Sequence, residues 1–262
     1  QRGIIMKVNG IVNQWSYPEA SERQLSRSLS TFAGEMAKKA RSLTGGIRFD
    51  ASDEEINDAE SELEEYAAGL ISAIVATLPA LAMTIYKFNS RQFLNVARKA
   101  GGGKNQSVIL LGVLGANASE SWYREKLSQW RGSAEASILK LSNDIISDWS
   151  QNLRVENVRN KTSQQIDEVL KQRYKVYTGW TVNRSRGIVS TWNSVLMRQR
   201  LDDAGVTHYF WHGRLDERER LQHVKWEGKR IEISSDHPFP GEPYGCRCWS
   251  VPDFTTANGG IS

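Results

Sequence analysis

Cysteine is nearly absent from this chain, because only Cys246 and Cys248 occur among its 262 residues. In an extended strand, residues two positions apart lie roughly 6.5 to 7 Å from each other along the backbone. That separation is at or beyond the reach of an unstrained disulfide. The pair therefore excludes the disulfide framework of a small secreted fold. Unpaired thiols fit a reducing compartment better.

Internal repeats and low-complexity tracts are also absent, which excludes repeat architectures and linker-like segments. The residues that follow Gln1 lack the basic, apolar and small-residue order of a signal peptide. Hydrophobic residues make up 39% of the sequence and charged residues 24%, as in ordinary soluble globular proteins. The length allows one large domain or two smaller ones with a sizeable core.

A strong excess of charge of either sign is missing as well. The net charge is +4, and residues 151–262 hold the whole excess with 17 basic and 13 acidic side chains. Lys and Arg displace counterions from phosphates, so this half is compatible with nearby nucleic acid. Dedicated nucleic-acid surfaces are usually denser in charge. We expect a mildly basic solvated surface that makes weak, salt-sensitive and non-specific contact with double-stranded DNA at best.

Amphipathic spacing predicts helices over the first two thirds of the chain. Residues 18–43 place apolar side chains at spacings of three and four, the pattern of one buried helix face. Ser52 and Glu55 form a capping box, which opens a second helix. Pro79 should end or kink that helix, because proline lacks the amide proton that a helix interior needs.

Two further pairs of the capping type predict helix starts downstream. Asn117 with Glu120 indicates the start of a long helix, and Thr162 with Gln165 that of a short helix. The two pairs do not predict where these helices end.

Residues 66–86 contain no charged side chain, and the run is long enough to cross a bilayer. It is rich in alanine, is interrupted by polar residues and Pro79, and follows strongly acidic sequence. We favour two helices that meet at Pro79 in the core of a bundle. Insertion into a membrane during a later step is the alternative.

The character of the sequence changes after the last predicted helix, residues 182–204, which Gly205 should terminate. Short alternating segments rich in β-branched and aromatic residues predict three strands at 207–211, 229–233 and 247–251. The fold class is therefore mainly α, with an elongated helical body over 1–180 and a small C-terminal α+β module over 181–262.

All histidines and cysteines of the chain fall between positions 208 and 248. This density suggests a zinc site formed by Cys246, Cys248 and His223, with His237 or His212 as the fourth ligand. Structural zinc sites usually carry cysteines two to four residues apart, whereas one residue separates these two. We therefore favour buried thiols packed against a small sheet and expect no cofactor, with zinc as the alternative.

The acidic and basic run from Asp216 to Arg220, followed by His223, also admits a hydrolase site. A carboxylate can orient the histidine, and arginines can hold a phosphate. The sequence offers no obvious nucleophile for such a site, and we do not expect an enzyme. We favour a hydrogen-bonded Asp–Arg network that pins a turn.

One ordered set of residues resembles the phage Mu F-like head-morphogenesis family. The motif D-x-R-x-R-x-x-H at 216–223 precedes C-R-C-x-x-x-P at 246–252 by about two dozen residues. The resemblance covers residues 80–255, including Asn89–Phe93. It departs from the family at Arg184-Ser185-Arg186, where relatives carry an acidic residue. The positions that carry it most closely are Arg198, Gln199, Gly205, Val206, Tyr209, Trp211, Asp216, Glu217, Arg218, Arg220, His223, Gly228, Pro240, Gly241, Glu242, Pro243, Cys246, Arg247, Cys248 and Pro252.

The resemblance implies a minor capsid component made in the bacterial cytoplasm and incorporated into the virion. Such a protein lies inside the capsid at or near the portal vertex and contributes to head morphogenesis, with roles in DNA packaging or ejection. Its implied partners are the portal protein, the capsid interior and packaged double-stranded DNA. The alternatives are a metal-dependent hydrolase or toxin-like effector carried in the particle, and a membrane-active ejection protein that uses residues 66–86.

Overall fold

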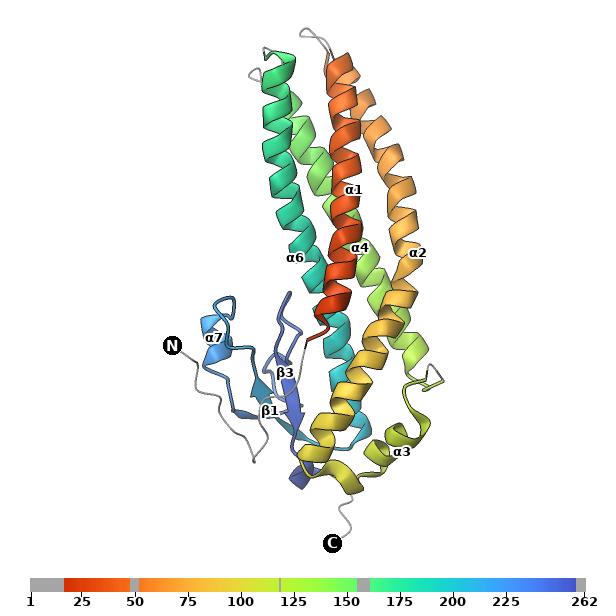
Figure 1. Cartoon of the computed structure of the whole chain (residues 1–262), viewed down its shortest axis with the longest axis vertical. Helices are drawn as coiled ribbons and strands as arrows, with labels where there is room; N and C mark the ends of the chain where they lie inside the picture. Colours follow the sequence, from red (N-terminus) through yellow and green to blue (C-terminus); the bar gives the residue numbers. More distant parts are fainter. Residues whose placement is uncertain (1–16, 48–51, 118, 155–160, 258–262) are drawn as a thin grey trace. The chain divides into compact units, whose positions relative to one another are not determined.

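The computed structural model describes residues 17–47, 52–117, 119–154 and 161–257 (Figure 1). The chain is mainly α-helical with a small antiparallel sheet near its C-terminal end, which confirms the predicted fold class. The helices are α1 (Glu19–Gly46), α2 (Asp53–Lys99), α3 (Gln106–Leu114), α4 (Tyr123–Arg154), α6 (Ser163–Asp203) and α7 (Leu221–Val224). The strands are β1 (His208–His212), β2 (Arg230–Glu232) and β3 (Trp249–Pro252), and short 3-10 helices cover Gly102–Lys104 and Phe254–Thr256.

The described residues form two compact units that interleave along the sequence. Unit 1 is built from parts of 1–21, 80–130 and 186–262, and unit 2 from parts of 22–79 and 131–185. The sequence prediction divided the chain linearly into 1–180 and 181–262. In the structure each unit instead draws on separate stretches, because α2, α4 and α6 each contribute residues to both.

Unit 2 is a bundle of four helical segments from α1, α2, α4 and α6 (Figure 1). The apolar side of α1 is fully buried there, as its spacing predicted. Trp149 of α4 donates its indole N–H to Thr44 of α1 over 3.0 Å. Ser30 of α1 and Thr181 of α6 share a hydrogen bond of the same length. Its fully buried side chains include Leu29, Phe32, Met36, Ile56, Leu63, Leu78, Ile138, Leu141 and Ile145.

Both capping boxes predicted at Ser52/Glu55 and Thr162/Gln165 are confirmed. The Ser52 amide donates to the Glu55 carboxylate over 2.7 Å, and the Glu55 amide donates back to the Ser52 hydroxyl over 3.2 Å. The Thr162 amide likewise donates to the Gln165 side chain over 2.9 Å. These contacts satisfy amides that the first helical turn leaves without intrahelical partners.

Two predicted helix boundaries are wrong. Pro79 lies inside the continuous helix α2, so there are no two helices that meet there. The predicted short helix and the last helix from residue 182 are likewise one helix, α6. A proline costs a helix interior about 3 kcal/mol. Leu78 and Leu81, buried on either side of Pro79, supply packing that offsets this local cost.

The predicted helix start at Asn117 and Glu120 is also wrong, because α4 begins at Tyr123. Asn117 instead forms a turn, in which its side-chain oxygen accepts the Ser119 amide over 3.0 Å. Helices α3 and α7 were not predicted, since both are short and α7 spans a single turn.

Helix α2 is, among the described residues, the one helix long and apolar enough to cross a membrane by length and composition. Its apolar side chains are nevertheless buried at helical spacing within the two units, for example Ile71, Ile74, Leu78, Leu81 and Ile85. A buried face of this kind is typical of a core helix in a bundle.

Unit 1 contains the sheet, whose strand order is β2-β1-β3 with both pairs antiparallel. Each predicted strand is present, shifted by no more than two residues at its start. Gly205 terminates α6, as expected, and has a φ of 65°. The Val206 amide then donates to the Leu201 carbonyl over 3.3 Å. The sheet packs in one core with side chains from α2, α3 and α6, among them Phe93, Val108, Leu111, Met197, Leu201, Tyr209, Trp211, Ile231, Phe239 and Val251.

Candidate functional site

Three predicted ligand side chains come together in unit 1. Cys246 and Cys248 lie in the segment that leads into β3, and His223 lies in α7. The His223 Nδ1 atom is 3.5 Å from the Cys246 sulfur and 3.4 Å from the Cys248 sulfur. The three ligand atoms all lie within 4.8 Å of one another, and all three residues are buried. Three ligand atoms this close together could share one metal ion.

Glu219 adds a carboxylate to this cluster. Its Oε1 atom lies 3.1 Å from the Cys248 sulfur and 3.3 Å from His223 Nδ1. The Glu219 side chain is only 4% exposed. The sequence analysis included Glu219 in the acidic run but not among the ligands, because nothing in the sequence places it beside cysteines some 30 positions away.

Backbone geometry explains how closely spaced cysteines converge. Gly241 and Gly245 take φ values of 85° and 73°, a left-handed conformation that glycine adopts without steric cost. The chain turns there, and the amides of Gly241 and Cys248 each donate to the Cys246 sulfur over 3.4 Å. The Cys246 amide is held by the Pro243 carbonyl over 2.8 Å. Both cysteines therefore precede strand β3, whereas the strand predicted over 247–251 included Cys248.

The protonation states follow from these contacts. The hydrogen bond from the Cys248 thiol, with the two backbone donors, lowers the pKa of Cys246 below its usual value. The pKa of Cys248 is raised because it donates to Cys246, and burial raises it further. Burial also lowers the pKa of His223, which favours the neutral ring. A thiolate and a neutral imidazole are the forms that bind metals.

The other histidines lie outside this group of ligand atoms. His237, one of the predicted zinc ligands, directs Nδ1 to the Pro238 carbonyl over 2.9 Å, and its ring packs against Trp226 at 4.3 Å between centroids. His212 is buried and pairs with Glu227 over 2.7 Å. His223 itself has the two cysteine sulfurs and the Glu219 carboxylate as neighbours.

An arginine network joins the two sequence motifs a second time. Asp216 accepts a hydrogen bond from the Arg247 guanidinium over 2.7 Å, and Arg247 stands between the two cysteines. Burial would raise the pKa of Asp216, but the hydrogen bond and charge of Arg247 hold it below its usual range. Arg218 contributes only its amide, over 3.1 Å, and Arg220 donates to the Tyr244 carbonyl over 2.7 Å. Asp216 therefore does pair with arginine, but with Arg247 and, at 3.7 Å, with Arg214 instead of with the side chains of Arg218 and Arg220.

The remaining motif residues support the same module. Trp211 is fully buried, and its carbonyl accepts the Gly228 amide over 2.8 Å, where Gly228 has a φ of 71°. Pro252 lies opposite Tyr209 in the sheet. Arg198 lies over the ring of Phe239, and Gln199 donates to Asp203 over 2.9 Å on the surface of α6.

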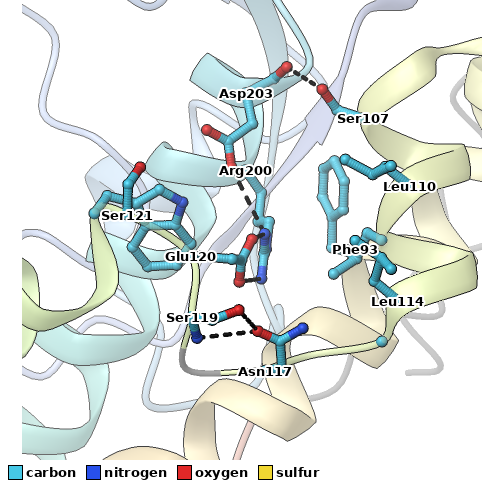
Figure 2. A pocket seen from close by; sticks show the side chains of 13 residues that line it. Phe93, Ser107, Leu110, Leu114, Asn117, Ser119, Glu120, Ser121, Arg200 and Asp203 are labelled. Carbon is cyan, nitrogen blue, oxygen red and sulfur yellow. Dashed lines mark hydrogen bonds and ion pairs between the residues drawn. The ribbon is translucent and has the colours of Figure 1, made fainter.

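A groove of about 380 Å³ opens elsewhere in unit 1 (Figure 2). The Arg200 side chain is only 3% exposed and forms a bidentate ion pair with Glu120. Its Nη2 atom donates to the Glu120 carboxylate over 2.8 Å. Phe93, Leu110 and Leu114 line the groove across from this pair in Figure 2. No histidine or cysteine is among the described residues that line it, and its two carboxylates, Glu120 and Asp203, both pair with Arg200.

Comparison with known proteins gives one short similarity. No family model matches the chain, and no solved structure matches it. A stretch of 63 residues, 23% of this chain, is 33% identical to an uncharacterized protein of Haemophilus influenzae. That stretch covers 14% of the Haemophilus protein, so we infer no activity for this chain from the similarity.

Proposed function

We propose that this chain is a non-enzymatic phage minor head protein, located in the capsid interior at or near the portal vertex. One observation carries the proposal on the structural side. The two motifs behind the resemblance to Mu F-like proteins contact each other twice, through Asp216–Arg247 and through His223 with the two cysteines. Contacts of this kind between two motifs support a role in stabilising the fold of the C-terminal module.

The cluster differs from a hydrolytic site in its access to solvent. Cys246, Cys248 and His223 are each 5% exposed or less, whereas a catalytic metal keeps a position open for water or substrate. The buried arrangement favours the structural interpretation over a metal-dependent hydrolase. The uncharged half of α2 remains the feature on which a membrane-active ejection role would rest.

Particles of the phage that encodes this chain provide the test. Quantitative mass spectrometry of gradient-purified virions should detect the chain at a small number of copies relative to the major capsid protein. A second preparation, from which DNA has been released, shows whether the chain stays with the emptied head or leaves it. Virions that contain no copy of the chain but remain infectious would refute the proposal.

A further inference from the structure

We propose that His223, Cys246, Cys248 and Glu219 bind a zinc ion in a closed, structural site within unit 1. The proposal concerns the stability of this unit and does not depend on the role in the phage head. It revises the ligand set expected from the sequence, because Glu219 takes the fourth position instead of His237.

The distances between ligand atoms match those of a coordinated ion. A tetrahedral zinc ion with ordinary bond lengths places nitrogen and sulfur ligands about 3.5 Å apart, and nitrogen and oxygen ligands about 3.3 Å apart. His223 Nδ1 lies 3.5 and 3.4 Å from the two sulfurs and 3.3 Å from the Glu219 oxygen. Three edges of the tetrahedron that meet at His223 are therefore already formed.

The buried carboxylate of the cluster is also suited to a cation. Glu219 lies 3.1 Å from the Cys248 sulfur, and neither side chain is more than 4% exposed. A carboxylate buried in this way has little water to solvate its charge, and a buried charge is unfavourable unless it is paired. A divalent ion among the four groups removes this penalty and stabilises the folded state.

Neighbouring residues hold the ligands in place and keep water out. The Arg214 amide donates to the other oxygen of Glu219 over 3.1 Å, which directs Oε1 toward the cluster. The rings of Trp226 and Trp211 lie 5.0 and 5.3 Å from the His223 ring. Hydrogen bonds to ligating groups and an apolar surround tune metal sites in this way. With no position open to solvent, the ion would act as a structural element.

His237 is the competing fourth ligand. Its Nε2 atom is buried and has no hydrogen-bond partner among the described residues. Neither His237 nor Glu219 belongs to the group of ligand atoms that all lie within 4.8 Å of one another. The Glu219 oxygen touches two members of that group, so the geometry favours Glu219.

Metal analysis of the full chain, purified under reducing conditions and dialysed against trace zinc, tests the site. We expect one zinc ion per chain, and substitution by cobalt should give the visible spectrum of a tetrahedral ion with thiolate charge-transfer bands. The double variant Cys246→Ser/Cys248→Ser should lose the ion. Far-UV circular dichroism shows which variants keep their helices.

Glu219→Ala and His237→Ala form the matched pair that assigns the fourth ligand. Competition with a chromogenic chelator should show at least a tenfold loss of zinc affinity for Glu219→Ala and no change for His237→Ala, together with a shifted cobalt spectrum for Glu219→Ala only. The reverse pattern would reject Glu219 as a ligand. Folded, reduced chain that binds neither zinc nor cobalt would overturn the whole site, and would leave the phage-head proposal untouched.

Discussion

At the scale of single residues, Asp216 and Arg247 define how the two motifs cooperate. Their side chains meet at 2.7 Å although they are 31 positions apart. Arg247 is 11% exposed and Asp216 34%, so the pair is only partly shielded from water. Solvent screening limits what this ion pair contributes to the free energy of unfolding, because water weakens the attraction between partly exposed charges. It still fixes the turn at Asp216 against the segment that carries the cysteines.

A double-mutant cycle on Asp216→Ala and Arg247→Ala should reveal this coupling. We expect the two losses of unfolding free energy to be non-additive by about 1 kcal/mol, the usual range for contacting residues. Urea titration of the four proteins measures the quantity. Additive losses of unfolding free energy would mean that the contact between Asp216 and Arg247 does not contribute to stability. Arg218→Ala serves as the control, because only its amide contacts Asp216.

Asp253 provides a prediction about pH. Burial would raise its pKa, but hydrogen bonds from Thr255 and Arg230 lower the pKa below the ordinary 3.8. The contribution of Asp253 to stability is therefore complete above the unfolded-state pKa and is lost as pH falls through the folded-state pKa. The gap in melting temperature between wild type and Asp253→Asn should be constant from neutral pH to about pH 5 and shrink at lower pH. Exposed Asp236→Asn is the control, and a gap that widened in acid would contradict the assignment.

At the scale of elements, local signals were reliable where the contacts are local. The capping boxes and the strand alternation involve neighbours in sequence, and both were predicted at the correct positions. Pro79 and the continuity of α6 were not, because long-range packing in the cores outweighs a single unfavourable residue. Glu120 was misassigned as a helix cap for a related reason, since its partner Arg200 is 80 positions away.

The start of α2 allows a matched test of one local signal. Ser52→Ala removes the hydroxyl that accepts the Glu55 amide and should lower the unfolding free energy by about 1 kcal/mol. Ser61→Ala changes the same residue type in the exposed interior of α2, where its hydroxyl bonds only to the Asn57 carbonyl. That variant should be neutral or slightly stabilising, because alanine favours the helix. Equal losses for both variants would show that the capping box contributes nothing particular.

At the scale of the whole molecule, the sequence identified the module better than it assigned roles within it. Density of histidine and cysteine pointed to residues 208–248, and the structure brings His223 and both cysteines together there. Glu219 was not recognised as their neighbour, and His237, a predicted ligand, packs against Trp226 and Trp211, the same rings that flank His223. Glu219 was missed because spacing along the chain cannot show which side of a turn a side chain faces.

Association with the portal tests the central claim most directly. The tagged chain should be co-expressed with the portal protein of the phage proposed to encode it. The complex is then washed at raised salt, to remove contacts made by charge alone, and measured by native mass spectrometry. The account predicts a complex in which a portal ring retains a defined number of copies of this chain, while an unrelated protein with the same tag retains none. A folded chain that leaves the column without the portal ring, when both proteins are soluble and abundant, would contradict it.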